Sequence, residues 1–291
     1  MLILYEGGLR FVLSTGNLVP LDYDYRTIGL YMKDFPPLER NVVMNEIGTH
    51  FNDTLHDYFN HLNVNVTYID DFNYSSVDGW LLLSVPGEFD KNTTHYGMKQ
   101  VQDILKNKLH LNLTKTRIDV QTSSIGNLKP YNRSVFSYHF TLNQNSEMRI
   151  YWPTEEFIRN SDLGYVGSET LIQLKEYAET NRSLMYTFQP KIPRHLTQTH
   201  MKTYVIYSNN YPIYGMLTSS NLSSAAWGFS KDNIFRMNNF EMGMLFIDNF
   251  NLDRFKLAYD LQHSIKYKAT DIPWISNIPH LVRDSNGNVI S

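Results

Sequence analysis

The sequence places a histidine, a lysine and an asparagine where they could act together on a phosphoryl group. His200 and Lys202 are two positions apart just before an apolar run, so in extended backbone their side chains point to the same face. Asn221 follows the next apolar run. Imidazole transfers protons, ammonium supplies positive charge and a carboxamide donates hydrogen bonds. This set predicts a site that stabilises charge on phosphate oxygens while a leaving oxygen is protonated, with no metal or other cofactor.

The segment around Asn221 has a counterpart near the start of the chain. Residues 12–18 read Val-Leu-Ser-Thr-Gly-Asn-Leu and residues 216–222 read Met-Leu-Thr-Ser-Ser-Asn-Leu. Each is an apolar strand end followed by small residues, mostly hydroxylated, and then Asn-Leu, which indicates a duplicated half with Asn17 matching Asn221. A strand that ends in such a turn is also a common structural feature, and the echo alone leaves that alternative open.

The spacing inside the second copy predicts where a matching histidine and lysine belong in the first. Asn221 comes 21 residues after His200 and 19 after Lys202. The same distances counted back from Asn17 reach positions before Met1, and the hairpin predicted for residues 1–13 begins without a leader. We therefore expect an N-terminally truncated chain whose first lobe is incomplete.

Apolar patterns predict the elements that position these residues. Helical periodicity occurs at residues 49–62, 95–109 and 168–180, and buried strands are predicted at 80–85, 205–207 and 242–247. Helices that alternate with buried strands favour an α/β fold with a mixed sheet.

Composition narrows the classes of function. The absence of cysteine excludes disulfides and thiolate metal sites. The longest apolar run, residues 80–85, is far shorter than the roughly 20 residues of a membrane helix, so no membrane association is expected. The net charge of −3 gives no global basic field, and any contact with DNA must be local.

Longer motifs carry a family resemblance. Residues 199–204 (Thr-His-Met-Lys-Thr-Tyr) and 218–228 closely resemble the second signature of tyrosyl-DNA phosphodiesterases, a family of the phospholipase D superfamily. Segments that resemble other parts of that family follow in the same order: 4–10, 14–18, 84–89, 123–128, 239–246 and 273–279. The resemblance spans essentially the whole chain. It implies two phospholipase D-like α/β/α lobes with mixed sheets, with the end of the first at residues 1–71 and the second at residues 72–291.

The resemblance implies a DNA-repair hydrolase. Such an enzyme acts on single-stranded or nicked DNA 3′ ends that carry a topoisomerase-derived tyrosyl peptide. One histidine attacks phosphorus and becomes a phosphohistidine, while a second protonates the tyrosine oxygen and then activates water. His200 matches the second histidine. Lys202, Asn221 and Asn17 match phosphate-binding positions, and Glu241 matches the carboxylate that orients the nucleophile. A nuclear, monomeric protein is expected on the same ground.

The resemblance also implies contacts with DNA and shows one departure. Ser123, Ser124 and Ser223 match positions that contact DNA phosphates, although Ser223 would equally serve as a helix cap. The family carries a glutamine, hydrogen-bonded to the acid histidine, where this sequence has Ile28. Isoleucine has no polar side-chain atom. The orientation of His200 is therefore expected to depend on another partner.

Three interpretations stay open from the sequence. The first is a DNA 3′-end phosphodiesterase whose nucleophilic His-x-Lys is missing from this chain, so that the chain alone has little or no turnover. The second is a relative without catalytic activity that binds DNA 3′ ends, or an inactive fragment. The third is lipid or general nuclease chemistry within the superfamily. The asparagine at position 221, where many members of the superfamily carry aspartate, argues against the third.

Overall fold

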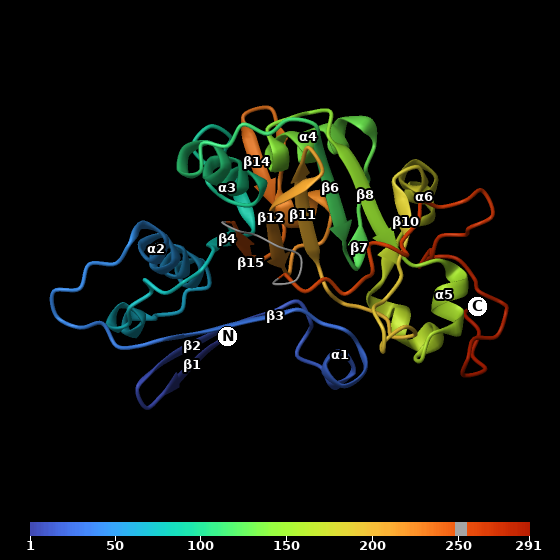
Figure 1. Ribbon diagram of the computed structural model, residues 1–291, viewed down its shortest axis with the longest axis horizontal. Coiled ribbons are helices and arrows are strands. Elements are labelled where there is room, and N and C mark those ends of the chain that lie inside the picture. The colour runs from blue at the N-terminus through green and yellow to red at the C-terminus, as the bar shows by residue number, and fades with distance from the viewer. Residues whose placement is uncertain (248–254) are drawn as a thin grey trace.

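The computed structural model describes residues 1–247 and 255–291, and a seven-stranded mixed sheet forms its centre (Figure 1). In pairing order its strands are β10 (Met185–Thr187), β8 (Glu147–Trp152), β6 (Thr116–Gln121), β11 (Thr203–Ser208), β12 (Tyr211–Thr218), β15 (Glu241–Phe246) and β4 (Trp80–Ser84). The β10–β8 and β8–β6 pairs are parallel and the others are antiparallel. All residues of β4 and β11 are buried, which accounts for their continuous apolar runs.

A second, three-stranded sheet lies across one end of the large sheet (Figure 1). It consists of β1 (Leu2–Tyr5), β2 (Gly8–Ser14) and β3 (Leu30–Phe35), all antiparallel. The β1–β2 turn contains Gly7, whose φ of 93° suits glycine. The ring of Tyr31 on β3 lies 5.5 Å from that of Phe246 on β15, so aromatic packing joins the two sheets.

Helices and short strands complete the described part of the chain. The α-helices are α1 (Pro20–Tyr25), α2 (Glu46–His61), α3 (Met98–Asp103), α4 (Pro130–Thr141), α5 (Glu155–Asn160), α6 (Lys175–Arg182) and α7 (Ser224–Trp227). The other helical turns are the 3₁₀ helices η1 (Thr67–Asp71) and η3 (Gly164–Thr170) and the π-helix η2 (Ile104–Lys108). The short strands are β5 (Gly87–Asp90), β13 (Phe229–Lys231) and β14 (Ile234–Met237), which form one sheet, and β7 (Ser124–Ile125) and β9 (Ile172–Gln173), which form another.

Capping residues account for where several helices begin. Asn45 precedes α2, and its side-chain oxygen accepts the N–H of Gly48 at 2.8 Å. The Thr154 hydroxyl accepts the N–H of Phe157 at 3.1 Å at the start of α5. Pro130 opens α4 in the first turn, where the absence of an N–H has no cost. The long helix α2 then contacts β4 and fixes one edge of the large sheet.

Most of the predicted elements are confirmed, and one is wrong. The hairpin, the three buried strands and the first two helices lie where the sequence predicts them. The helix predicted for residues 168–180 does not form as one unit. Ser168 does not cap it; its hydroxyl donates to the Tyr165 carbonyl inside η3, and β9 then pairs with β7 before α6 begins. Pairing with a distant strand outweighed the local helical periodicity. The lobe boundary between residues 71 and 72 stays a prediction.

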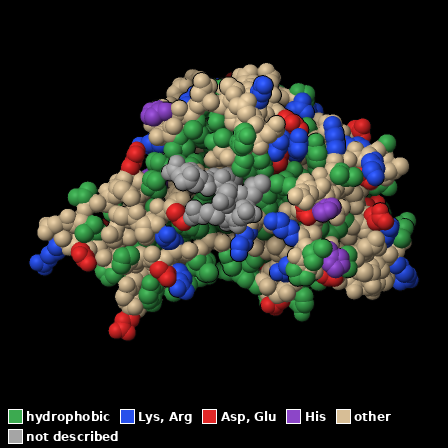
Figure 2. Space-filling view, in the orientation of Figure 1, with side chains coloured by type: hydrophobic (Ala, Val, Ile, Leu, Met, Phe, Trp, Pro, Cys, Tyr) green, Lys and Arg blue, Asp and Glu red, His purple; other side chains and the backbone are tan. Residues whose placement is uncertain are grey.

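The described residues contain neither a membrane-spanning helix nor a cluster of metal-binding side chains. No helix in residues 1–247 or 255–291 combines the length and the apolar character needed to cross a membrane. The same residues hold no group of three or more His, Asp or Glu side chains arranged to bind a metal ion. On the face drawn in Figure 2, Lys and Arg side chains are interspersed with acidic ones.

Candidate active site

His200 lies beside α1, because its ring contacts Asp22 of that helix. His200 and Lys202 immediately precede β11 instead of lying within it, in a segment held by Thr27. The N–H of His200 donates to the Thr27 carbonyl at 2.9 Å, and Thr27 forms a parallel bridge with Thr199. Both functional side chains are about 95 % buried. The first half of the chain thus fixes the backbone that presents the second half's imidazole.

Asp22 on α1 is the hydrogen-bond partner of His200. The carboxylate oxygen Oδ2 lies 2.8 Å from Nδ1 of His200 and also accepts the backbone N–H of Asn17 at 2.6 Å. The other oxygen, Oδ1, accepts an N–H of Arg26 at 2.5 Å. Asp22 is fully buried. The expectation that His200 needs a partner other than residue 28 is therefore met by a residue that the sequence did not single out.

Lys202 connects the two halves through backbone carbonyls. Its Nζ donates to the Thr15 carbonyl at 2.8 Å and to the His200 carbonyl at 3.1 Å. The Lys202 carbonyl in turn accepts the N–H of Thr218 at 3.2 Å, so β12 and its following turn are aligned with Lys202. The ammonium is therefore held beside the residues that precede Asn17.

Burial shifts the pKa values of both cationic side chains. Burial lowers the pKa of Lys202 to about 7, although the Glu241 and Asp22 carboxylates act in the opposite direction. Burial also lowers the pKa of His200 to about 4, with a further contribution from Lys202, and Asp22 opposes this shift. For Asp22, burial alone would raise the pKa, but hydrogen bonds from Arg26 and His200 bring it below its usual value. These shifts leave Asp22 ionised and His200 neutral at pH 7.

Asn221 is oriented by four donors. Its Oδ1 accepts the hydroxyls of Thr122 and Ser123 at 3.0 Å each, the Ser123 N–H at 3.2 Å and the Ser124 N–H at 3.0 Å. An oxygen with four donors defines which end of the carboxamide faces them. Within the described part of the chain, the Nδ2 group has no hydrogen-bond partner. The carboxamide is therefore fixed through its oxygen, and the phosphate-binding role of Asn221 stays a prediction.

Asn17 is placed near His200 and Lys202 but is differently supported. Its backbone N–H shares Oδ2 of Asp22 with His200, and Lys202 contacts the carbonyl two residues earlier. Its side chain is exposed, and among residues 1–247 and 255–291 nothing hydrogen-bonds its carboxamide. The predicted proximity of Asn17 to the His200–Lys202 pair is therefore observed, whereas no hydrogen bond in the described residues fixes the orientation of its carboxamide.

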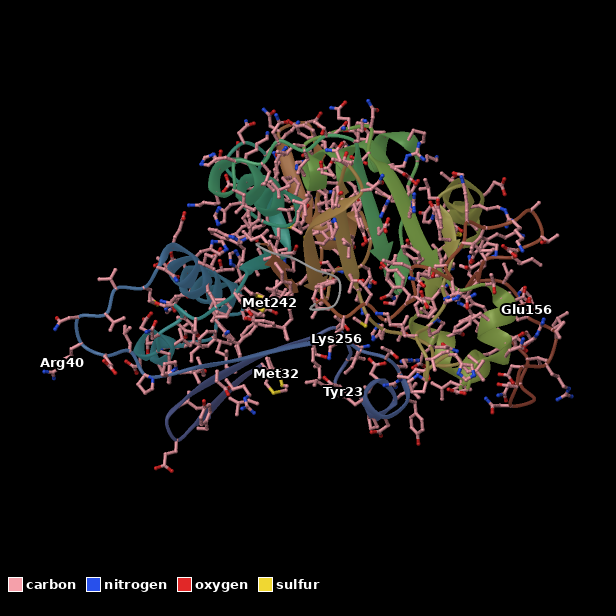
Figure 3. The ribbon with its side chains drawn as sticks, in the orientation of Figure 1. Tyr23, Met32, Arg40, Glu156, Met242 and Lys256 are labelled. Carbon is pink, nitrogen blue, oxygen red and sulfur yellow. The ribbon has the colours of Figure 1, made fainter. Side chains whose placement is uncertain are left out.

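Glu241 is the first residue of β15, and its carboxylate is close enough to Lys202 to act on the pKa of that side chain. Oε2 accepts the Ser219 hydroxyl at 2.5 Å, and Oε1 accepts the Asn239 carboxamide at 3.0 Å. Figure 3 labels the next residue, Met242, near the end of the large sheet that faces β3, and Tyr23 on α1. A cavity of about 200 Å³ near this position is lined by Met1, Ser14, Ser219 and Met242, among others. Glu241 itself does not line this cavity, although Phe240 and Met242 on either side of it do, so its role in orienting a nucleophile stays a prediction.

The three serines predicted to contact DNA have different surroundings. Ser123 is fully buried, and both its N–H and its hydroxyl donate to Asn221. Ser124 is half-buried and donates its N–H to the same oxygen. Ser223 caps α7, because its hydroxyl accepts the N–H of Ala226 at 3.3 Å. The cap is confirmed, and the DNA contacts stay predictions.

The structure shows the same hydrogen bonds in both copies of the echo. Ser14 and Thr218 each accept the N–H two residues later through a hydroxyl oxygen, at 3.1 and 3.0 Å. The carbonyls of Asn17 and Asn221 each accept the N–H two residues later, both at 2.8 Å. The hydroxyls of Thr15 and Ser219 each accept an N–H from the neighbouring strand, from Gly29 at 2.9 Å and from Met242 at 3.0 Å. The two copies are therefore structural equivalents, in which Gly29 corresponds to Met242 and Ile28 to Glu241.

Comparisons with known proteins agree with this geometry. The sequence model for the tyrosyl-DNA phosphodiesterase family matches residues 1–280. The chain is 26% identical to tyrosyl-DNA phosphodiesterase 1 of Arabidopsis thaliana over 275 residues, 84% of this chain and 45% of that protein. It is 27% identical to a probable tyrosyl-DNA phosphodiesterase of Caenorhabditis elegans over 305 residues, 94% of this chain and 66% of that protein. The chain thus spans about half to two thirds of the length of these relatives.

Solved structures show the same fold. The crystal structure of the yeast tyrosyl-DNA phosphodiesterase matches with a TM-score of 0.73 at 18% identity, covering 94% of this chain and 75% of that one. At that identity the likeness concerns the fold. It confirms the predicted α/β class with mixed sheets.

Proposed function

Because this chain belongs to the tyrosyl-DNA phosphodiesterase family, we propose that its site binds the phosphate at a DNA 3′ end and takes part in hydrolysis of a tyrosyl ester there. One observation carries the proposal: a buried imidazole and a buried ammonium lie beside the matched asparagine turns of two separate sheets. Lys202 and the donors of Asn221 would stabilise the charge that develops on the phosphate oxygens.

His200 is the general acid in the proposed first step. A bound phosphate adds negative charge near Nε2, which favours the protonated imidazole. As a nucleophilic nitrogen attacks phosphorus, the bond between phosphorus and the tyrosine oxygen breaks, and His200 gives its proton to that oxygen. In the second step His200 takes a proton from water while the water oxygen attacks phosphorus and the phosphorus–nitrogen bond breaks. The acid and the base are the same group, in opposite protonation states.

The nucleophile of this mechanism is a histidine that the 291 residues do not provide ahead of Asn17. The strand register defines where it would fit. Met1 and Val12 exchange hydrogen bonds of 2.8 and 2.9 Å, and Val12 is the echo of Met216, which pairs with Tyr204. A lysine two residues ahead of Met1 and a histidine four residues ahead would therefore copy the positions of Lys202 and His200. This differs by one residue from the position counted back from Asn17, because the β11–β12 hairpin contains a register shift.

The decisive experiment adds that segment. A chain extended at its N-terminus with histidine four and lysine two residues ahead of Met1 is expected to release tyrosine from a 3′-phosphotyrosyl oligonucleotide. The 291-residue chain is expected to show little or no release. His200→Ala in the extended chain removes the acid and should slow release about 10²–10⁴-fold. The proposed mechanism is falsified if the extended chain is inactive or if His200→Ala leaves its rate unchanged.

A second function, binding of DNA 3′ ends without turnover, is favoured by the completeness of the second half of the site. His200, Lys202 and Asn221 are all in place without any added segment. The test compares oligonucleotides with 3′-phosphate and 3′-hydroxyl ends in fluorescence anisotropy with the 291-residue chain. Preference for the phosphate, lost in Lys202→Met, supports end binding. Equal affinity for both ends argues against any phosphate site. The DNA-repair role, the nuclear location and the monomeric state stay proposals from the family.

A further inference from the structure

Two buried charged side chains, Asp22 and Arg26, lie behind His200 and are linked to it by hydrogen bonds. Asp22 receives hydrogen bonds from three separate segments: the turn at Asn17, its own helix at Arg26, and His200, which lies 178 residues away in the sequence. Arg26 is also buried, and its second N–H group donates to the Gly167 carbonyl at 2.7 Å. A buried ion pair is rarely retained for stability alone, because desolvation offsets most of the attraction.

The equivalence of the two halves shows that the residue matching Glu241 cannot be the hydrogen-bond partner of His200, so that Asp22 takes this place. Ile28 corresponds to Glu241, since the residues that follow them, Gly29 and Met242, make equivalent hydrogen bonds. Glu241 has a carboxylate, which accepts hydrogen bonds from Ser219 and Asn239, whereas Ile28 has no polar atom to offer His200. Without Asp22, Nδ1 of His200 would be buried with no partner, at a cost of about 1–3 kcal/mol, and its tautomer would be undefined.

We propose that Asp22 is the positioning residue of His200: it holds the proton on Nδ1, so that Nε2 is the atom that exchanges protons with the substrate. A carboxylate only accepts hydrogen bonds, so the imidazole nitrogen that faces it must carry the hydrogen. Arg26 keeps the carboxylate ionised and in place. The inference rests on the proposed function for its purpose, but the tautomer can be measured without any substrate.

The same oxygen couples His200 to the first half of the site. Oδ2 of Asp22 accepts both the Asn17 N–H and the imidazole N–H, so a movement of the Asn17 turn changes the support of His200. The charged groups around the imidazole are Asp22 and Arg26 from α1 and Lys202 from its own segment. Asp22 is the one anion among these three. Its removal leaves the imidazole beside two cations.

The geometry predicts a specific result for Asp22→Asn. The guanidinium of Arg26 has donors and no acceptor, so it selects the amide oxygen of the new side chain. The amide N–H₂ then faces His200 and reverses its tautomer to Nε2–H. In the double variant Asp22→Asn with Arg26→Met this constraint is gone. The amide oxygen is then free to turn toward the N–H of Asn17, and the Nδ1–H tautomer should return.

The experiment is long-range ¹H–¹⁵N NMR of the imidazoles in the 291-residue chain, with His200→Ala to assign the signal. Wild type should show Nδ1–H, Asp22→Asn should lose it, and the double variant should regain it. Asp260→Asn is the matched control, because Asp260 binds Nδ1 of the exposed His263 at 2.8 Å and should leave His200 unchanged. An Nε2–H tautomer in wild type overturns the proposal even if no variant folds.

The two proposals can fail separately. If the tautomers behave as stated but no oligonucleotide with a 3′-phosphate binds, the positioning role stands and the proposed function is wrong. If the oligonucleotide binds with the selectivity given above but Asp22→Asn leaves the His200 tautomer unchanged, the phosphate site stands and Asp22 is merely structural. In the extended chain, Asp22→Asn should lower kcat with little change in KM, and a purely structural role would change both.

Discussion

The turns at residues 14–19 and 218–223 have the same local hydrogen bonds but unequal surroundings. In the second turn the Asn221 oxygen is held by four donors, and the preceding strand lies inside the large sheet. In the first turn the Asn17 side chain is exposed, and the preceding strand, β2, lies at the centre of the small three-stranded sheet. Equal turn geometry therefore does not give equal chemistry. The neighbours that the fold supplies decide whether hydrogen bonds hold the carboxamide in one orientation.

The largest expected effect is that of replacing Lys202, which should change both the affinity for a 3′-phosphorylated oligonucleotide and the free energy of unfolding. Lys202→Met removes a charged donor and should weaken binding of a 3′-phosphorylated oligonucleotide about 10–100-fold at fixed salt. The same change should raise the free energy of unfolding at pH 7 by about 1–4 kcal/mol, because the buried ammonium, with its pKa of about 7, is costly to keep charged. Binding is measured by anisotropy and stability by urea denaturation.

Exposed Lys231 on β13 provides the control for this prediction. Lys231→Met should change neither quantity appreciably. A Lys202→Met protein that is less stable than wild type at pH 7 would show that the ammonium is well compensated by its carbonyl partners. The inference that a charged Lys202 lowers the stability of the protein would then be wrong.

The next effect is the pH dependence of stability that His200 causes. Its pKa is about 4 in the folded protein and about 6.5 in the unfolded chain, so between these values only the unfolded chain binds the proton. Stability should therefore fall by roughly 2–3 kcal/mol as pH falls from 6.5 to 4. His200→Gln should flatten this part of the profile. The control is His263→Gln at an exposed position, which should leave the profile unchanged. If the profile of His200→Gln is as steep as that of wild type, the lowered pKa assigned to His200 is wrong.

A smaller effect separates the two asparagines directly. Asn221→Ala leaves the N–H groups of Ser123 and Ser124 without their acceptor and should cost about 1–3 kcal/mol of folding stability. Asn17→Ala removes an exposed carboxamide and should change stability by less than about 0.5 kcal/mol. Thermal or urea unfolding of both variants tests the pair. Equal costs would mean that the surroundings of the two turns do not differ as described.

The smallest effect concerns the residue that precedes each helix. Ser223 caps α7 through its hydroxyl, whereas Val19, its equivalent before α1, has no side-chain hydrogen bond to the helix. Val19→Ser should therefore stabilise the protein by about 0.5–1 kcal/mol, and Ser223→Val should destabilise it by about 1 kcal/mol. If Val19→Ser instead destabilises the protein, the loss of apolar contacts of Val19 outweighs the gain of a helix cap, and the prediction is wrong.

The sequence was sufficient where the determinants are local. The hairpin at residues 1–13, the apolar runs of β4, β11 and β15, and the two asparagine turns follow from patterns of a few residues, and each is confirmed. The family resemblance also rests on contiguous motifs, and the match over residues 1–280 confirms it. The predicted helix at residues 168–180 shows the limit, since the β7–β9 pairing that prevents it depends on a segment far away in the sequence.

The partner of His200 was decided by tertiary structure alone. The sequence showed that Ile28 cannot orient the imidazole, but nothing in it distinguished Asp22 from the other acidic residues of the chain. A carboxylate on a six-residue helix becomes a positioning group only when the packing of the two sheets brings it to a histidine 178 residues later and buries both. Local propensity acts over a few residues, whereas a shared buried hydrogen bond requires the whole fold to be in place.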